Sequence, residues 1–303
     1  MRMRPVVLSP LAALALAACG GGPVDTGPPT DVKLDQANRA GTQALSVDMP
    51  NLAVREYKVA LTRAYERDDA GAIADVAYNL ALAQMKSGDS KAALATMRDA
   101  RAELDRRHVQ IPAELFLVEA AASYRIGDLA GASAAAQQAL DRQAKDPDTV
   151  PRAWFIRGLV AAERSDGATL NQAIAALPPT KQADLEADRQ ELQGRAALLD
   201  NRPADALALF EQSAANRQQA LDYRGMARAL SFAGDSALRS NRAADAADLF
   251  LRAGRSALLQ GDTATALPLL KQAEDLARQT AQASIVEEVA RLRKAAAERA
   301  TRA

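Results

Sequence analysis

The sequence predicts an all-α protein, and three features indicate that class. About a quarter of the 303 residues are alanine, which is the strongest helix former and is depleted from strands. Aromatic residues contribute only 4% of the chain, while 49% is hydrophobic and 25% is charged, a composition typical of amphipathic helices. Apolar residues recur at intervals of three and four rather than two. These features exclude a β-rich fold.

Charge and cysteine content limit the chemistry that the chain can perform. Lys and Arg total 38, as do Asp and Glu, so the formal net charge is zero and no basic surface for nucleic acid is expected. A single Cys and a single His cannot form a disulfide framework or a Cys/His zinc site. We therefore expect no metal, no cofactor and no nucleic-acid partner.

The chain begins with a segment that has the features of a targeting signal, residues 1–18. Arg2 and Arg4 precede an apolar stretch, residues 6–18, that is too short to span a bilayer as a helix. The stretch leads into Leu16-Ala17-Ala18-Cys19, which resembles the lipobox of bacterial lipoproteins. The resemblance implies cleavage before Cys19, a diacylglycerol thioether on its sulfur and an acyl chain such as palmitate on its amino group. An ordinary secretory signal with an incidental cysteine is the alternative.

The residues that follow Cys19 indicate where such a lipoprotein would reside. Gly20 stands where an Asp tends to retain Gram-negative lipoproteins at the inner membrane, so the resemblance implies the outer membrane, with the protein facing the periplasm. Residues 19–31 are rich in Gly and Pro, and we expect them to be a flexible tether with a typical reach of roughly 20 Å. No basic cluster flanks Cys19, so lipid alone is expected to provide the attachment.

A pattern of small and apolar residues recurs through the rest of the chain. A small residue is followed by an apolar one four positions later and a small one three positions after that, which places all three on one helical face. The six copies are Ala53/Tyr57/Ala60, Ala93/Met97/Ala100, Ala132/Ala136/Ala139, Ala206/Phe210/Ser213, Ala246/Phe250/Ala253 and Ala266/Leu270/Ala273. Twelve positions before each copy stands another small residue, namely Gly41, Ala81, Ala120, Gly194, Gly234 or Gly254. Because glycine inside a helix costs about 0.5–1 kcal/mol relative to alanine, these glycines indicate close approach of a neighbouring helix.

Helix ends are predicted seven positions after these small residues. The residues there are Asp48, Gly88, Gly127, Asn201, Asn241 and Gly261. Gly and Asn favour the left-handed backbone conformation that ends a helix. Asp89, Asp128 and Asp262 follow the three glycines, and we expect each to cap the next helix by accepting hydrogen bonds from its first amides.

This succession of helices and turns resembles the tetratricopeptide repeat (TPR) family over roughly residues 32–280. The resemblance places repeats near Leu34, Ala74, Ala113, Pro151, Ala187 and Ala227, with Trp154 and Gly158 marking the fourth. The starts lie 36–40 residues apart, against about 34 in the family, which predicts longer helices and an irregular superhelical pitch. The second helix of the fourth repeat is degenerate in sequence. We expect one tetratricopeptide-like solenoid of about seven hairpins over residues 32–303, closed by a capping helix near 283–301.

The resemblance also implies a binding groove. First helices line the concave surface of TPR proteins, and the corresponding positions of the second to fourth repeats are mostly apolar: Tyr78, Leu82, Met85, Leu117, Tyr124, Phe155 and Leu159. Lys86, Arg125 and Arg152 are expected at its rim. The same positions of the next two repeats carry charges, among them Asp188, Glu191, Arg195 and Arg228. The alternative is that the apolar side chains pack between adjacent first helices and leave no groove.

The resemblance implies a lipid-anchored periplasmic scaffold that binds an envelope protein through an amphipathic helix or an apolar peptide. Assembly of outer-membrane proteins, pilus secretins or the peptidoglycan machinery are examples of such a role. The Lys and Asn with which some TPR domains hold chaperone peptides are replaced by Asn38, Thr42, Tyr78 and Leu82. A self-assembling structural envelope protein without a groove is the alternative.

An enzyme is not expected. The chain contains no GxSxG, GxxxxGK[ST] or HExxH motif. Glycosidase-type catalysis requires two acids that face each other across a groove, and we expect helical stacking to place most acidic side chains on outer faces. His108 is expected to interact with the end of a helix, and Asp68, Asp69 and Asp166 to lie in turns.

Overall fold

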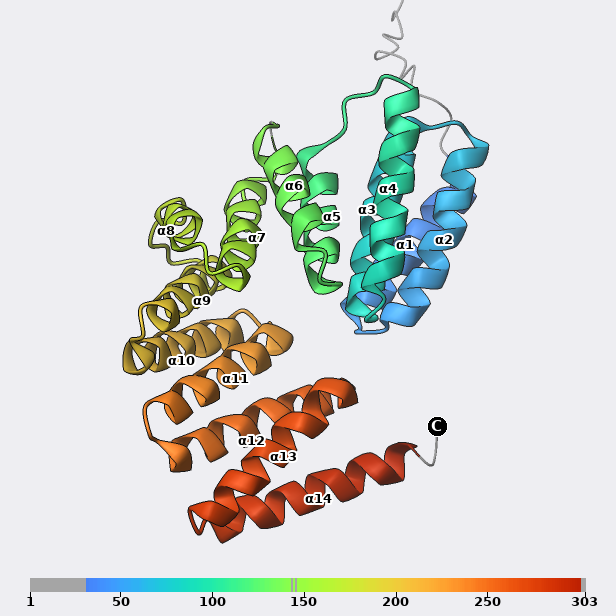
Figure 1. Cartoon of the computed structure of the whole chain (residues 1–303). Coiled ribbons are helices and arrows are strands. Elements are labelled where there is room, and N and C mark those ends of the chain that lie inside the picture. The colour runs from blue at the N-terminus through green and yellow to red at the C-terminus, as the bar shows by residue number, and fades with distance from the viewer. Residues whose placement is uncertain (1–30, 143, 145, 301–303) are drawn as a thin grey trace, which may run out of the picture.

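The computed structural model describes residues 31–142, 144 and 146–300, and within these ranges every regular element is an α-helix (Figure 1). The fourteen helices described are α1 (Val32–Ser46), α2 (Pro50–Glu66), α3 (Ala70–Lys86), α4 (Ser90–Arg106), α5 (Ala113–Arg125), α6 (Leu129–Leu140), α7 (Thr149–Glu163), α8 (Gly167–Ala175), α9 (Ala183–Leu199), α10 (Pro203–Gln219), α11 (Tyr223–Arg239), α12 (Ala243–Leu259), α13 (Thr263–Gln279) and α14 (Ala283–Ala300). The all-α prediction is confirmed. The signal peptide at 1–18 and residues 19–30 of the tether lie outside the described residues.

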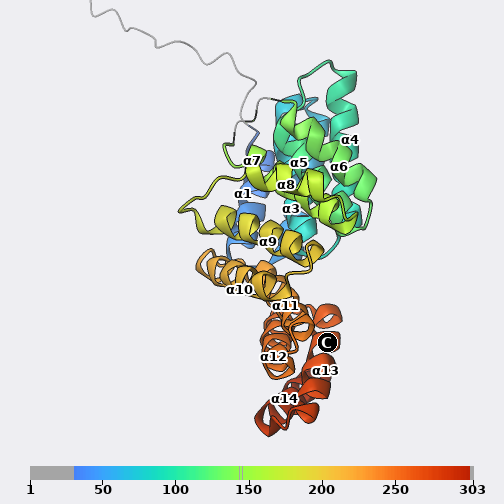
Figure 2. The same ribbon diagram turned by 60° about the vertical axis from the view of Figure 1, so that its left-hand side comes forward.

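Consecutive helices pack on one another and form seven hairpins, from α1/α2 to α13/α14, which stack into a curved solenoid. In Figure 1, α1 to α4 stand upright whereas α9 to α14 lie across the view, so the stack bends around a concave side. Figure 2 shows α11 to α14 extending the stack away from the N-terminal hairpins. The predicted helical-hairpin solenoid of about seven hairpins is therefore confirmed.

In several hairpins, a glycine of one helix lies against a large side chain of the next helix, sixteen positions later in the sequence. A Cβ on Gly41 would lie 2.7 Å from the ring of Tyr57, and one on Gly194 would lie 2.8 Å from the ring of Phe210. Where the later residue is the smaller Met97 or Ala136, the first residue is alanine instead of glycine. The predicted close approach of neighbouring helices is therefore confirmed.

The predicted helix ends also form as expected. Asp48, Gly88, Gly127, Asn201, Asn241 and Gly261 all have positive φ, between 55° and 93°. The carboxylates of Asp89, Asp128 and Asp262 accept hydrogen bonds from the amides of Ala92, Gly131 and Thr265 at 2.9, 2.8 and 3.1 Å. These turns fix where each helix stops and the next begins, and hence the register of the stack.

The fourth hairpin departs from the regular pattern, as its degenerate sequence predicts. Helix α8 has 9 residues, whereas α9 to α13 have 17 each. With so short a helix in between, α9 packs directly on α7, and Leu192 of α9 occupies the space beside Gly158 where a Cβ would stand. This hairpin separates the upright part of the stack from the part that lies across the view in Figure 1.

Helix α14 covers the C-terminal end of the stack with one face. Ile285 and Val289 are buried against α12 and α13, with Leu292 beside them, while most other described side chains of α14 are exposed. Across the described part of the chain, no helix is both long enough and apolar enough to cross a membrane.

Candidate functional site

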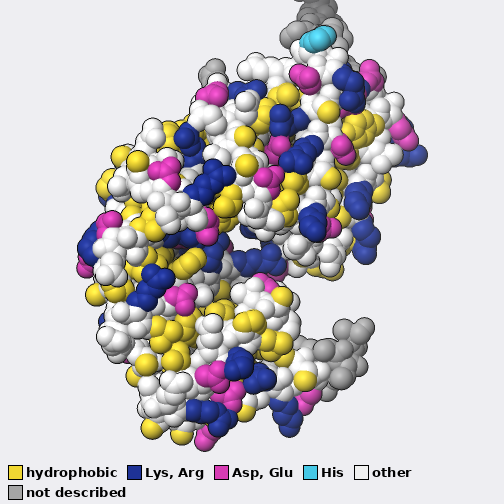
Figure 3. Space-filling view, viewed as in Figure 1, with side chains coloured by type: hydrophobic (Ala, Val, Ile, Leu, Met, Phe, Trp, Pro, Cys, Tyr) yellow, Lys and Arg dark blue, Asp and Glu magenta, His cyan; other side chains and the backbone are white. Residues whose placement is uncertain are grey.

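A cavity of about 470 Å³ lies on the concave side of the solenoid, and we call it the groove cavity. Side chains from α3, α5, α7, α9, α10 and α11 surround it. Eight of the ten predicted groove residues line it: Tyr78, Leu82, Leu117, Tyr124, Arg125, Arg152, Phe155 and Leu159. Figure 3 shows a hollow in the middle of this face, with Lys and Arg side chains around it. The fold thus assembles one surface from residues spread over five hairpins.

The apolar wall combines side chains that belong to the core with side chains that remain accessible. Phe155 and Leu159 of α7 are 9% and 4% exposed and pack in the core around α8 and α9. Tyr78, Leu82 and Tyr124 are only half-buried. The α7 side chains therefore pack between helices and form the floor of the cavity. Those of α3 and α5 form its accessible sides.

Met85 and Lys86 lie away from the groove cavity. The side chain of Met85 is buried among α3, α4 and α5, with 7% exposed. Lys86 is directed to the first hairpin, where its amino group pairs with Asp48 at 3.1 Å and donates to the carbonyl oxygen of Leu45 at 3.4 Å. Both residues share the helical face of Tyr78 and Leu82, but they lie about one turn further along α3, beyond the end of the groove cavity.

The polar wall is a network of ion pairs centred on Glu191 of α9, which is fully buried. We call it the arginine network, and its members are Asp188, Glu191, Arg195, Arg217 and Arg228. The Glu191 carboxylate accepts from Arg217 at 2.7 Å, from two nitrogens of Arg228 at 2.8 and 3.1 Å, and from Arg195 at 3.3 Å. Four hydrogen bonds satisfy both oxygens, which a buried carboxylate requires.

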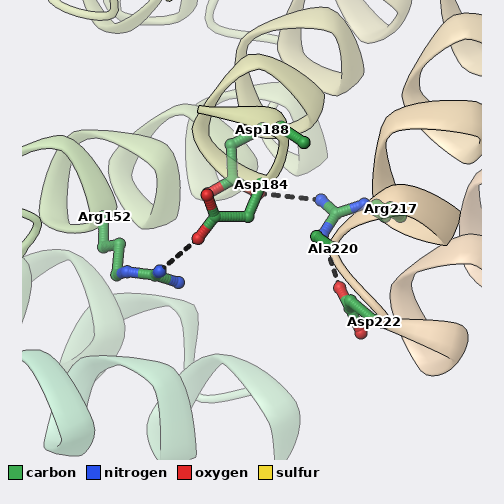
Figure 4. Close-up of a pocket in the computed structure, with 7 residues that line it drawn as sticks. Arg152, Asp184, Asp188, Arg217, Ala220 and Asp222 are labelled. Atoms are coloured by element: carbon green, nitrogen blue, oxygen red, sulfur yellow. Dashed lines mark hydrogen bonds and ion pairs between the residues drawn. The ribbon is translucent and has the colours of Figure 1, made fainter. Parts of the chain in front are cut away.

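Further pairs extend this network between two cavities. Arg217 also binds Asp188 at 2.8 Å and Asp222 at 2.7 Å, while Arg152 binds Asp184 at 2.5 Å (Figure 4). These residues line a second cavity of about 430 Å³, and Arg152, Asp188, Arg217 and Asp222 line the groove cavity as well. The pairs thus join α7 to α9 and α9 to α10 beside the irregular fourth hairpin.

The pKa values of the two carboxyl groups in the network are shifted in opposite directions. Burial alone would raise the pKa of Glu191, but the positive charges of Arg228, Arg217 and Arg195 outweigh it and lower that pKa to about 2. Burial raises the pKa of Asp188 to about 6; Arg217 opposes this shift, and the negative charge of Glu191 adds to it. Glu191 is the member that the arginines hold ionised.

Acidic residues in the interior were not expected from the sequence. The general expectation that most acidic side chains lie on outer faces does not hold for Asp188 and Glu191, because three arginines from α9, α10 and α11 compensate their charges inside the stack. The sequence does show them at groove-lining positions. Arg217 was missed because it lies on α10, a second helix, whereas the predicted groove positions all lie on first helices.

The other polar residues singled out in the sequence lie in turns. Asp69 and Asp166 cap α3 and α8 through the amides of Ala72 and Thr169, both at 3.0 Å. His108 has a φ of 54° in the turn after α4 and does not line the groove cavity. Among the residues that the structure describes, no group of three or more His, Cys, Asp or Glu side chains could hold a metal ion.

The arrangement of hairpins is that of a TPR-type solenoid, and solved structures of that class are similar to it. A tetratricopeptide repeat protein from Parabacteroides merdae aligns over 86% of this chain and 98% of its own, with 14% identity and a TM-score of 0.51. The TPR2AB domain of yeast Sti1, from a complex with pHSP90, covers 87% of this chain and 98% of its own with 16% identity, but its TM-score is 0.34. No protein-family model and no curated protein matches the sequence. The first similarity establishes the fold alone.

Proposed function

We propose that this protein is a lipid-anchored scaffold of the bacterial cell envelope that binds a segment of another protein in the groove cavity. The observation that carries the proposal is the groove cavity itself, which joins accessible aromatic and aliphatic side chains of α3 and α5 to cationic side chains of α11. Aromatic residues in such concave sites dominate the energetics of protein interfaces. TPR-type solenoids provide extended concave surfaces of the kind that bind other proteins.

Replacing the two groove tyrosines tests this proposal. In the variant Tyr78→Glu/Tyr124→Glu, two half-buried rings of the groove cavity become charged. We expect the amount of partner captured by crosslinking in cells to fall roughly tenfold or more. Tyr65→Glu is the matched control, because Tyr65 is 38% exposed on α2 and lies outside the groove cavity. Equal capture by the folded groove variant would contradict the proposal, with circular dichroism reporting the fold.

The proposed membrane attachment rests on Cys19 and is tested separately. Two or three acyl chains hold a protein stably on a membrane, whereas one does so only marginally. We expect Cys19→Ser to release the protein from the membrane fraction and to abolish the mass increase that lipidation gives. Recovery of Cys19→Ser in the outer-membrane fraction would contradict the lipid anchor and leave the groove proposal standing.

A further inference from the structure

A third cavity lies along α11 and shares two lining residues with the groove cavity; we call it the second chamber. This chamber has a volume of about 300 Å³, and its apolar wall is formed by side chains such as Phe232 and Leu269. Arg224 and Arg228 line both spaces, so they stand where the groove cavity and the second chamber meet. The two spaces therefore each combine apolar and polar side chains, and they have Arg224 and Arg228 in common.

Two arginines that line the groove cavity, Arg125 and Arg224, have no carboxylate partner. Within the described ranges, neither Arg125 nor Arg224 forms an ion pair, and one nitrogen of Arg125 donates to the carbonyl oxygen of Met85 at 3.0 Å. Burial lowers the pKa of Arg125, and the positive charges of Arg228 and Arg224 lower it further, against the opposing charge of Asp222. Arginines from α5 and α11 thus line the same cavity, near enough for their charges to interact.

The carboxylates that line the groove cavity already have partners. Asp188 and Asp222 both bind Arg217, and Asp222 also caps α11 through the amide of Gly225 at 2.9 Å. Asp146 accepts from the amide of Asp148 at 2.9 Å. Five arginines and three aspartates line this cavity, and Glu191 and Asp184 behind its wall pair with Arg217, Arg228 and Arg152, which leaves Arg125 and Arg224 as the lining arginines without a carboxylate. A guanidinium group that lacks a carboxylate has free N–H donors for an anionic ligand.

We propose that the segment bound in the groove carries a side-chain carboxylate flanked on both sides by apolar residues. This inference rests on the proposed function and specifies the chemistry of the partner. The carboxylate binds Arg125 and Arg224 on the wall of the groove cavity. One apolar flank enters the groove cavity beside Tyr78, Leu82 and Leu117, and the other enters the second chamber beside Phe232 and Leu269. Arg228 adds positive charge there, since it is 41% exposed while it remains bound to Glu191.

Selection from a phage-displayed library of random peptides on the full-length protein in detergent tests this inference. We expect enriched peptides to contain Asp or Glu between apolar residues. Changing that residue to Asn or Gln in a synthetic peptide should weaken binding about tenfold, as loss of a charge-assisted hydrogen bond predicts. On Arg125→Gln/Arg224→Gln, the acidic peptide and its amide form should bind equally. Arg239→Gln, an exposed position of the same α11, is the control and should leave the preference intact.

The outcomes separate this inference from the proposed function. Enriched peptides that lack acidic residues, or that keep their preference on Arg125→Gln/Arg224→Gln, would overturn the acidic specificity. If Tyr78→Glu/Tyr124→Glu abolishes binding of those same peptides, the groove proposal stands. Failure to enrich any peptide would contradict both.

Discussion

The charged side chains of the arginine network are the residues whose burial most needs an explanation. A carboxylate removed from water loses several kcal/mol of solvation, and only close, well-satisfied partners compensate that loss. Glu191 has such partners in three arginines from three helices. The network therefore fixes how α9, α10 and α11 are placed beside the groove cavity, and it does so through specific geometry rather than through apolar area.

Asp188 gives this part of the protein a predictable pH dependence. Its pKa is raised from 3.8 to about 6 by burial, in the presence of Arg217, Glu191, Arg152 and Arg228. The folded state then binds this proton more tightly than the unfolded state, so the free energy of unfolding that Asp188 contributes falls as the pH rises from about 4 to 6. Asp188→Asn removes that dependence.

Urea unfolding of the wild type and Asp188→Asn at acidic and at neutral pH measures the effect. We expect the difference in unfolding free energy to move in favour of the variant as the pH rises. Asp105→Asn, at an exposed position of α4, serves as the control. A difference that stays constant with pH would show that the folded state does not retain this proton.

Backbone residues with positive φ show how far single positions can be read from sequence. The Gly, Asn and Asp residues that follow α1, α3, α5, α9, α11 and α12 were predicted, because these residue types tolerate the left-handed conformation. Leu221 and Ala281 adopt the same conformation at φ 57° and could not be found this way. For them the packing of the hairpin, and not local preference, determines the backbone.

At the scale of the helix pair, a glycine leaves the space that an aromatic ring of the next helix occupies. A Cβ on Gly234 would lie 2.7 Å from the Phe250 ring. Overpacking a core costs about 1–3 kcal/mol, whereas glycine to alanine in a helix gains up to about 1 kcal/mol. We expect Gly234→Ala to lower the unfolding free energy by about 1–2 kcal/mol, as measured by urea denaturation. Gly167→Ala is the control and should be neutral or slightly stabilising, because no atom lies within 4 Å of its added Cβ.

A double variant tests whether size matching is the cause. Gly234→Ala/Phe250→Met reproduces the Ala81 and Met97 pair of the second hairpin. The double variant should lose less unfolding free energy than the two single variants lose together, by about 0.5 kcal/mol or more. Strict additivity would contradict direct packing between the two positions.

Helices and their ends were predictable because their signals are local. The spacing of small residues, the caps and the turn residues all act within about twenty positions of each other, and each hairpin repeats them. The shortness of α8 was indicated by its degenerate pattern. The direct packing of α9 on α7 was not, since it depends on which surface a short helix leaves uncovered.

At the scale of the whole molecule, curvature creates the groove cavity. The apolar positions of α3, α5 and α7 were predicted individually, since they repeat at one register of the first helices. Their meeting with Arg224 and Arg228 of α11 depends on the bend of the stack, to which every hairpin contributes a small rotation. No local pattern encodes that sum, so the sequence places Asp188 and Arg228 at groove-lining positions but does not show that they meet the apolar side chains of α3, α5 and α7.

Site-specific photo-crosslinking in cells tests the central claim most directly. A benzoylphenylalanine residue would replace Leu82 or Leu117 in the groove cavity, or Val59, which is 58% exposed on α2, as the control. We predict one protein adduct from both groove positions, suppressed by Tyr124→Glu and absent from Val59. An adduct from Val59 alone, or of equal strength from all three positions, would contradict a binding site on the concave side.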